Sequence, residues 1–202
     1  MIRIVAFLGN IGAEYRWHRH NVGWQFLDSM PQYQTLSWAL KFKGQIASVD
    51  AGETRVLFLK PLTYMNLSGE SLAEAARFYR IRPDEVLVVH DELEMVFGAF
   101  GYKFSGGLGG HNGLRSIERL LGTRDFWRLR FGIGRPDHDD IASYVLSPFT
   151  REEQEILHSA VFPQAAATFT SMLVHGIEGY DQRYKKVQPY KPPRPSHEQD
   201  MS

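Results

Sequence analysis

Asn10, Asn66, Asp91 and Asn112 each come shortly after an apolar run of the sequence, and His20 precedes a helical pattern. A neutral imidazole can take a proton from water, and a carboxylate can orient the imidazole that does so. An amide side chain donates and accepts hydrogen bonds without ionising, so it suits an ester or amide carbonyl. These residue types therefore suit a site with a histidine general base, a carboxylate that orients it, and amides that recognise a carbonyl or place a water molecule.

The pairing of His20 with Asp91 is the step on which this chemistry depends. The N-terminus of a helix that begins near Asn21 disfavours an imidazolium at His20 and so favours the neutral ring. A carboxylate at Asp91 acts in the opposite sense, because it raises the basicity of the ring and fixes its tautomer. The alternative is that His20 only enters the helix and bonds to backbone, and spacing in the sequence does not separate the two interpretations.

The segment GGLGGHNG, residues 106–113, surrounds His111 and Asn112 with glycine. Its spacing is not that of a dinucleotide-binding GxGxxG loop, and no Gly-Lys-Ser/Thr follows to make it a P-loop. Glycine lets the backbone approach a ligand closely, and the N–H groups that open the following helix suit an anion. The alternative is a flexible loop, with the asparagines serving as turn or cap residues.

Several other catalytic signatures are missing from the sequence. It has no cysteine, which excludes disulfides, thiolate metal sites and a cysteine nucleophile. It contains no Gly-x-Ser-x-Gly elbow and no His-Glu-x-x-His metal motif. A metal-dependent hydrolase would take its ligands from His18, His20, His90 and Asp91. That alternative stays open beside the activation of water by His20 without a metal.

Apolar periodicity predicts one α/β domain. Strands are expected at 2–9, 45–50, 55–60, 85–90, 99–104 and 127–134. Helices are expected at 21–30, 68–79, 114–121 and 151–175, the last of them bent near Pro163. This alternation predicts a mixed, mostly parallel twisted sheet flanked by helices, with antiparallel hairpin additions. Ligand sites in such sheets form beyond the carboxyl ends of the strands, which is where the polar residues named first would gather.

Charge is unevenly distributed along a chain of 202 residues with a net charge of zero. Residues 101–135 hold seven basic and two acidic side chains. A local basic field of this kind is compatible with a phosphate-bearing ligand that touches one face, and a solvated face is the alternative. The stretch 183–202 holds four of the ten prolines, so we expect a domain at 1–182 followed by a basic, proline-rich and flexible tail.

The apolar runs are too short for a membrane protein. None approaches the roughly 20 residues of a membrane-spanning helix. The first residues lack the basic region and cleavage site of a signal peptide. We therefore expect a soluble, cytoplasmic protein with no membrane partner.

Four blocks of the sequence match the motifs of a known family in order and spacing. They are FLGNIGAEYRWHRHNVGWQFLD, KPLTYMNLSGE, VVHDELEMVFGAFGYKFSGGLGGHNGLRSIERLLG and RLRFGIGRP. The chain resembles bacterial-type peptidyl-tRNA hydrolase in these blocks, and the matched region around them extends from residue 2 to about 149. The resemblance implies a monomeric α/β enzyme that works without a metal or cofactor. Its implied reaction is hydrolysis of the ester between a peptide and the 3′ ribose of tRNA.

The same resemblance implies a role for individual residues. His20 matches the general base, Asp91 the carboxylate that supports it, and Asn10 the position that distinguishes an N-blocked peptidyl group from a free aminoacyl group. The implied substrate contacts are Tyr15, Tyr64, Met65, Asn66, His111 and Asn112. Lys103 and Arg130 match basic residues that meet the 5′-phosphate of tRNA. The implied partner is peptidyl-tRNA, held through its acceptor stem, 3′ end and 5′-phosphate.

Three positions depart from the family pattern. Ile11 stands where proline is usual, His18 where threonine is common, and Gly101 where some members carry a second lysine, which predicts slightly weaker phosphate binding. A non-catalytic RNA-binding protein on the same fold is the rival interpretation. The joint presence of the histidine, the carboxylate and the asparagines argues against it.

Overall fold

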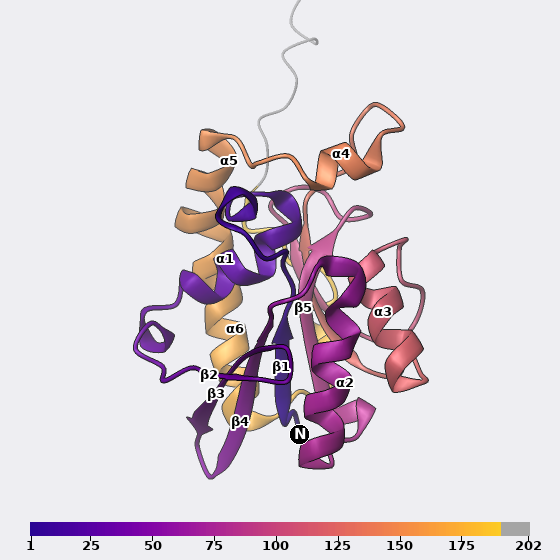
Figure 1. The fold of residues 1–202 in the computed structure, drawn as a ribbon. Coiled ribbons are helices and arrows are strands. Elements are labelled where there is room, and N and C mark those ends of the chain that lie inside the picture. Colours follow the sequence, from indigo (N-terminus) through magenta and orange to yellow (C-terminus); the bar gives the residue numbers. More distant parts are fainter. Residues whose placement is uncertain (191–202) are drawn as a thin grey trace, which may run out of the picture.

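A mixed seven-stranded sheet forms the centre of the computed structural model, which describes residues 1–190 (Figure 1). Its strands are β1 (Ile4–Phe7), β2 (Ala39–Lys41), β3 (Gly44–Ala51), β4 (Thr54–Pro61), β5 (Val86–Glu92), β6 (Phe100–Phe104) and β7 (Trp127–Gly132). Their order across the sheet is β2-β3-β4-β1-β5-β7-β6. The four central strands β4, β1, β5 and β7 are parallel, while β2, β3 and β6 pair antiparallel to their neighbours. The predicted fold class is confirmed.

Helices cover both faces of this sheet, as Figure 1 shows with α1 and α6 on one side and α2 and α3 on the other. The helices are α1 (Val22–Asp28), α2 (Ser68–Tyr79), α3 (Asn112–Leu121), α4 (Ile141–Val145), α5 (Arg151–Ile156), α6 (Phe162–His175) and α7 (Tyr180–Arg183). Burial on both faces explains why β1 and β5 read as continuous apolar runs. Phe26, Phe58 and Phe169 pack together under α1 and α6, and Leu72 and Ile117 lie in the second core under α2 and α3.

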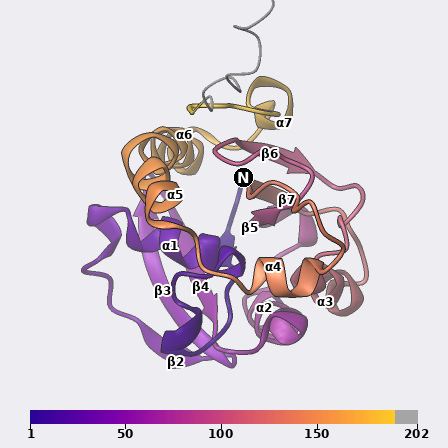
Figure 2. The same ribbon diagram turned by 90° about the horizontal axis from the view of Figure 1, so that it is seen from above.

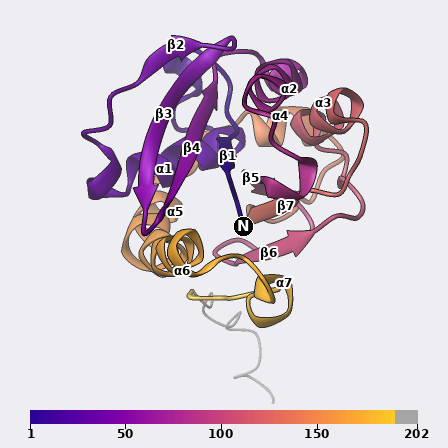
Figure 3. The same cartoon turned by 90° about the horizontal axis from the view of Figure 1, so that it is seen from below.

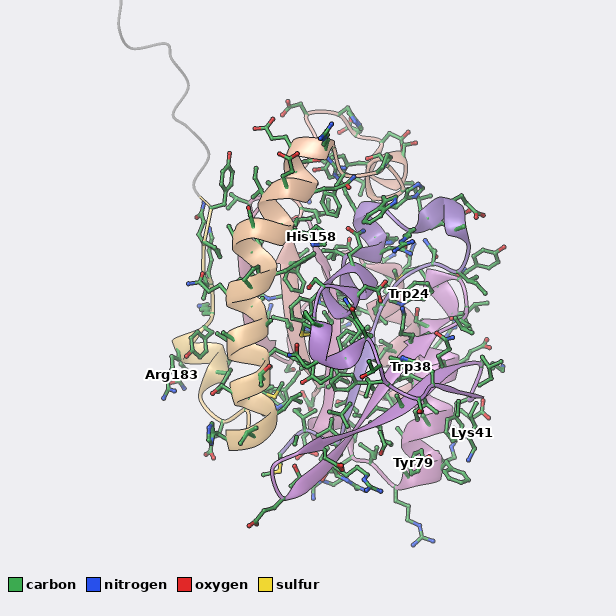
Figure 4. All side chains as sticks on the ribbon, turned by 90° about the vertical axis from the view of Figure 1, so that its left-hand side faces the viewer. Trp24, Trp38, Lys41, Tyr79, His158 and Arg183 are labelled. Carbon is green, nitrogen blue, oxygen red and sulfur yellow. The ribbon has the colours of Figure 1, made fainter. Side chains whose placement is uncertain are left out.

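The long helix expected at 151–175 contains a local change of helix type just before Pro163, where a bend was expected. A π-helical turn at Leu157–Val161 joins α5 to α6. Proline has no N–H to donate and its ring crowds the carbonyl four residues earlier, so a wider turn before it relieves both problems. Figure 4 shows α5, this turn and α6 as one continuous column that carries His158.

Element boundaries differ from expectation mainly at the edge of the sheet. The predicted hairpin of 45–50 and 55–60 is present as β3 and β4. The short edge strand β2 was not predicted, because its three residues are all exposed and show no alternation of buried and exposed side chains. Within residues 1–190, no helix is both long and apolar enough to cross a membrane.

The described chain after α7 runs back along β6, and Figure 3 shows α7 beside that strand. Phe100 and Val187 exchange both backbone hydrogen bonds, with N···O distances of 2.9 and 2.7 Å. The Tyr102 N–H also donates to the Tyr184 carbonyl at 2.8 Å. The predicted tail of 183–202 therefore begins within a part of the chain that pairs with the sheet, and its residues 191–202 lie outside the described part.

Candidate active site

The polar residues gather at the carboxyl ends of the parallel strands, where α4 crosses the top of the molecule (Figure 2). Asn10 follows β1, and Asp91 lies near the end of β5. His20 lies in the 3-10 turn Arg19–Asn21, which leads into α1. The His20 Nδ1 atom is 2.8 Å from Asp91 Oδ1, and both side chains are buried. The pairing on which the predicted chemistry depends is therefore present in the fold.

Asn112 reaches the carboxyl ends of the parallel strands by a different route from the one expected. The strand before it, β6, runs antiparallel to β7. The carboxyl end of β6 therefore lies beside the amino ends of the parallel strands, away from the site. The glycine segment that follows β6 carries the chain back to the start of α3, next to Asp91. The expectation that Asn112 follows a strand end at the site was wrong, because strand direction depends on pairing that sequence periodicity does not reveal.

A second histidine shares the same carboxylate oxygen. The His111 Nε2 atom lies 3.0 Å from Asp91 Oδ1, and its ring is 4.8 Å from that of His20. The His111 Nδ1 atom accepts hydrogen bonds from the backbone N–H groups of Gly113 and Leu114, at 3.1 and 3.4 Å, and so caps α3. His111 was expected only as a substrate contact. In the structure it also caps α3 and hydrogen-bonds to Asp91.

These contacts fix the proton positions. An ionised carboxylate only accepts hydrogen bonds, so the nitrogens of His20 and His111 that face Asp91 both carry hydrogen. The neutral His20 ring is then the Nδ1–H tautomer, and its Nε2 atom keeps a lone pair. In the neutral state this nitrogen is the basic atom of the pair.

Charge and burial act against each other at both groups. Burial alone raises the pKa of Asp91, but the two imidazoles and their hydrogen bonds hold that pKa well below its usual range. Burial lowers the pKa of His20, but the Asp91 charge and hydrogen bond outweigh it, so the pKa lies above the ordinary value of 6.5. The expected effect of Asp91 on the basicity of His20 is therefore present and exceeds that of burial.

Asn10 is held rigidly by two neighbours. Its Oδ1 atom accepts from the Met65 N–H at 2.8 Å. Asn21 clamps its backbone, because the Asn10 N–H donates to Asn21 Oδ1 and Asn21 Nδ2 donates to the Asn10 carbonyl, both at 2.9 Å. Within the described chain the Asn10 Nδ2 atom has no protein acceptor, so it is a fixed donor. Asn21 was expected only as a helix cap, and no pattern in the sequence connects it with Asn10.

The cleft around these residues has two lobes that share His20, Asn112, Ala142 and Val145. The amide lobe, about 390 Å³, adds Asn10, Tyr15, Tyr64, Met65, Asn66 and Leu146. The arginine lobe, about 350 Å³, adds Asp91, Glu92, Leu93, Gly109, Gly110, His111, Arg115, Arg135 and Ile141. Nine of the residues predicted for the site line these lobes, and α4 forms a wall common to both.

A buried arginine, Arg128, holds the glycine segment 106–113 in place through hydrogen bonds to its backbone. Arg128 is completely buried, and its Nη1 and Nη2 atoms donate to the carbonyls of Gly107 and Gly106 at 2.7 and 3.2 Å. A Cβ atom on Gly113 would lie 2.6 Å from Met65 Sδ, so the close approach requires glycine there. Burial, with nearby Arg130, lowers the pKa of Arg128 to about 10, which leaves the side chain charged at pH 7. In the sequence Arg128 is only one of the basic residues of 101–135, and nothing there indicates that it holds the glycine segment.

Lys103 and Arg130, the other predicted contacts, lie outside both lobes. They project from β6 and β7 on the same face of the sheet as Arg128, because Lys103 pairs with Arg128 and Gly101 with Arg130 across the two strands. We call Lys103, Arg128 and Arg130 the basic face. Burial and the charges of the two arginines lower the pKa of Lys103.

The chain around His20 is tied to a distant segment. His18 bridges to Pro148, and the Arg19 N–H donates to the Ser147 carbonyl at 3.0 Å. The buried Arg19 guanidinium contacts both Glu153 carboxylate oxygens at 2.8 Å. The loop that carries His20 is therefore held by the last third of the chain as well as by Asp91.

One group of potential metal ligands exists within the described residues. His20, Asp91 and His111 offer atoms that all lie within 4.8 Å of one another. This group has His111 in place of the His18 and His90 that the metal-dependent alternative named. The His90 Nδ1 atom contacts the Asp91 carbonyl at 2.6 Å, and burial holds the His90 pKa well below its usual range. In this geometry the three groups are already paired through hydrogen bonds.

Comparison of the sequence and the fold with known proteins points to one family. A family model described as Peptidyl-tRNA hydrolase matches residues 4–192. A Trichlorobacter lovleyi protein of that name is 50% identical over 154 residues, 76% of this chain and 80% of its own. One from Treponema pallidum is 47% identical over 177 residues, 85% of each chain. A crystal structure of peptidyl-tRNA hydrolase from Acinetobacter baumannii has a TM-score of 0.82 and 34% identity, covering 94% of this chain and 97% of that one.

The family model, the sequence relatives and the solved structure each match this chain over most of its length. The chain belongs to the peptidyl-tRNA hydrolase family.

Proposed function

We propose that this protein hydrolyses the ester bond between the peptide and the 3′ ribose of peptidyl-tRNA, with His20 as the general base. The observation that carries the proposal is the hydrogen bond between His20 Nδ1 and Asp91 Oδ1, which leaves the basic Nε2 atom in a cleft lined by amides. All of these groups come from one chain, which fits a monomer. Its substrate is a product of translation, which fits the cytoplasm.

In the first step, His20 Nε2 removes a proton from a water molecule as its oxygen attacks the ester carbonyl. The positive charge that forms on His20 is stabilised by Asp91, which cannot reach solvent and is held ionised by its two imidazole neighbours. The negative charge that forms on the carbonyl oxygen needs a fixed donor. Asn10 Nδ2 is such a donor, because the Met65 N–H holds the amide by its Oδ1 atom while Asn21 holds the Asn10 backbone.

In the second step, the imidazolium returns its proton to the leaving 3′ oxygen of the ribose. The ester C–O bond breaks, and the products are a tRNA with a free 3′ hydroxyl and a peptide carboxylic acid, which loses its remaining proton to solvent. His20 is again neutral, so one ring serves as base and then as acid. No other protein group has to change its protonation state.

The two lobes suit parts of the substrate that differ in charge. The amide lobe contains asparagines and tyrosines, which hydrogen-bond to a peptide without requiring it to be charged. The arginine lobe contains Arg115 and Arg135, which suit the phosphates of the tRNA 3′ end. A free aminoacyl group would bring an ammonium next to Asn10, where an acylated nitrogen brings a neutral amide.

The basic face takes phosphates farther along the tRNA. Lys103 and Arg130 lie on the sheet next to the arginine lobe, since Glu92 lines that lobe and is 3.9 Å from Arg130. Burial, followed by repulsion from Arg128 and Arg130, lowers the pKa of Lys103, and a bound phosphate would offset the repulsion. This arrangement supports binding of the acceptor stem and its 5′-phosphate.

The test compares N-acetyl-aminoacyl-tRNA with the unblocked aminoacyl-tRNA, each incubated with the purified chain in the presence and absence of EDTA. Cleavage of only the blocked substrate, unchanged by EDTA, is the expected result. Loss of cleavage in EDTA would favour a metal held by His20, Asp91 and His111. Binding of tRNA without cleavage of either substrate would favour a non-catalytic RNA-binding protein.

A further inference from the structure

The segment 184–187 closes the outer edge of the sheet next to the basic face. Its backbone bonds to Phe100 and Tyr102 hold it against β6. Tyr184 and Val187 pack on the core beneath α6, so the segment is attached by side chains as well as by backbone. Lys185, between them, is exposed. The segment therefore presents a lysine at a fixed place on the edge of the sheet.

Gly101 and Arg130 connect this segment to the basic face. A Cβ atom at position 101 would lie 2.2 Å from the Lys185 carbonyl oxygen, so the segment occupies the space that a side chain at 101 would need. Arg130 pairs with Gly101 across the strands, and its Nη2 atom donates to that same carbonyl at 3.0 Å. Because position 101 has no side chain, the guanidinium and the segment can meet directly above it.

Charge accumulates where they meet. Lys103, Arg128 and Arg130 lie on this face, and Lys185 is near enough for its charge to lower the pKa of Lys103 further, after burial and the two arginines. Among residues 1–190, Glu92 is the one carboxylate that acts against this trend on Lys103, and it also lies 3.9 Å from Arg130. Arg128 is already bonded to the glycine carbonyls. An excess of closely spaced cations with few acidic partners is what a phosphate site requires.

We propose that segment 184–187 completes a phosphate-binding site in which Lys185, Lys103 and Arg130 together hold one phosphate of the tRNA. The proposal rests on the proposed function for its ligand, since peptidyl-tRNA supplies the phosphate. It adds a binding residue from the end of the chain to a surface otherwise built from β6 and β7. Lys186 takes part in neither the Arg130 contact nor the effect on Lys103, which makes it a matched control.

The experiment measures binding of uncharged tRNA to the full chain at several NaCl concentrations. Lys185→Glu and Lys186→Glu change the net charge equally at neighbouring exposed positions. We expect Lys185→Glu to weaken binding about tenfold more than Lys186→Glu and to lower the salt slope by about one, the value for one phosphate contact. Lys185→Arg should bind like the unchanged chain. Gly101→Ala, which removes no charge, should also weaken binding because it displaces the segment.

The use of tRNA with and without its 5′-phosphate identifies the phosphate concerned. If the effect of Lys185→Glu disappears with dephosphorylated tRNA, the site holds the terminal phosphate, and if it persists, the site holds one in the backbone. Equal effects of Lys185→Glu and Lys186→Glu would overturn the proposal, as would unchanged binding by Gly101→Ala. Hydrolysis of N-acetyl-aminoacyl-tRNA by the unchanged chain is measured separately, so failure of the proposed activity is distinguished from failure of this site.

Discussion

The cleft and the basic face use polar groups in opposite ways. In the cleft, Asp91, His20 and His111 are buried and each bonds to another in a fixed geometry. On the basic face, Lys103 and Arg130 repel each other and lie partly open to solvent. A buried network whose hydrogen bonds are all formed holds its groups in place for one chemical step. A cluster of cations instead attracts a polyanion through a field that extends into solvent. We therefore expect the cleft to control the rate of hydrolysis and the basic face to control affinity.

The largest effect should come from His20→Ala, which removes the proposed base. Loss of a general base typically lowers the rate by about 10²- to 10⁴-fold. Single-turnover hydrolysis of N-acetyl-aminoacyl-tRNA measures it, and tRNA binding should stay unchanged. His18→Ala, on the same loop but outside both lobes, is the control. Normal turnover by His20→Ala would remove the base assignment.

Asp91→Asn should lower the rate by about 10- to 10³-fold and also change its pH dependence. In the unchanged chain the pKa of His20 is raised, so the active neutral form is lost as pH falls through a value above 6.5. Asparagine removes the charge that raises this pKa and leaves burial, which lowers it. The midpoint of the pH profile should then move to lower pH. A profile that does not move would show that Asp91 does not set the basicity of His20.

Arg128→Met tests a residue that belongs to both regions, since it lies on the basic face and holds the glycine segment of the cleft. Removal of its two charge-assisted hydrogen bonds should lower the free energy of unfolding by about 2–4 kcal/mol. Urea denaturation measures this change. The rate of hydrolysis should fall as well, because Gly106 and Gly107 lose their anchor. A defect confined to the salt dependence of binding would place Arg128 with the basic face alone.

The smallest effects should come from Lys103→Ala and Arg130→Ala. Each should raise KM about tenfold at low salt and reduce the salt slope by about one, because one phosphate contact is lost. Since neither residue lines the cleft, kcat should remain that of the unchanged chain. Steady-state hydrolysis at increasing NaCl measures both quantities. If kcat falls instead, the division between rate and affinity does not hold.

The sequence predicts the components of the site better than their connections. His20, Asp91 and Asn10 follow from residue chemistry and from a family resemblance that spans much of the chain. The role of Asn21 was not predicted, because its bonds to Asn10 depend on how the loop after β1 folds back on α1. The role of Arg128 was not predicted either, since an arginine in a strand is usually exposed and only the buried path of the glycine segment shows its purpose.

The fold class was predicted correctly, and the details that were missed again involve contacts between distant parts of the chain. The central strands were found because burial on both faces leaves a clear apolar signal. The direction of β6 and the pairing of 184–187 leave no such signal, since each depends on hydrogen bonds to another strand. A proline-rich composition led us to expect a flexible tail from 183, yet Val187 pairs with Phe100.

The ties between the His20 loop and residues 147–153 have a consequence for how activity arises during folding. The loop is completed by Arg19 bonds to Ser147, Pro148 and Glu153, far along the chain. Closure over such separations is slow, so it comes after local helices and hairpins have formed. Catalysis is then a property acquired late. Recovery of hydrolysis during refolding should lag behind recovery of helical circular dichroism, and a chain ending before residue 147 should bind tRNA poorly and hydrolyse nothing.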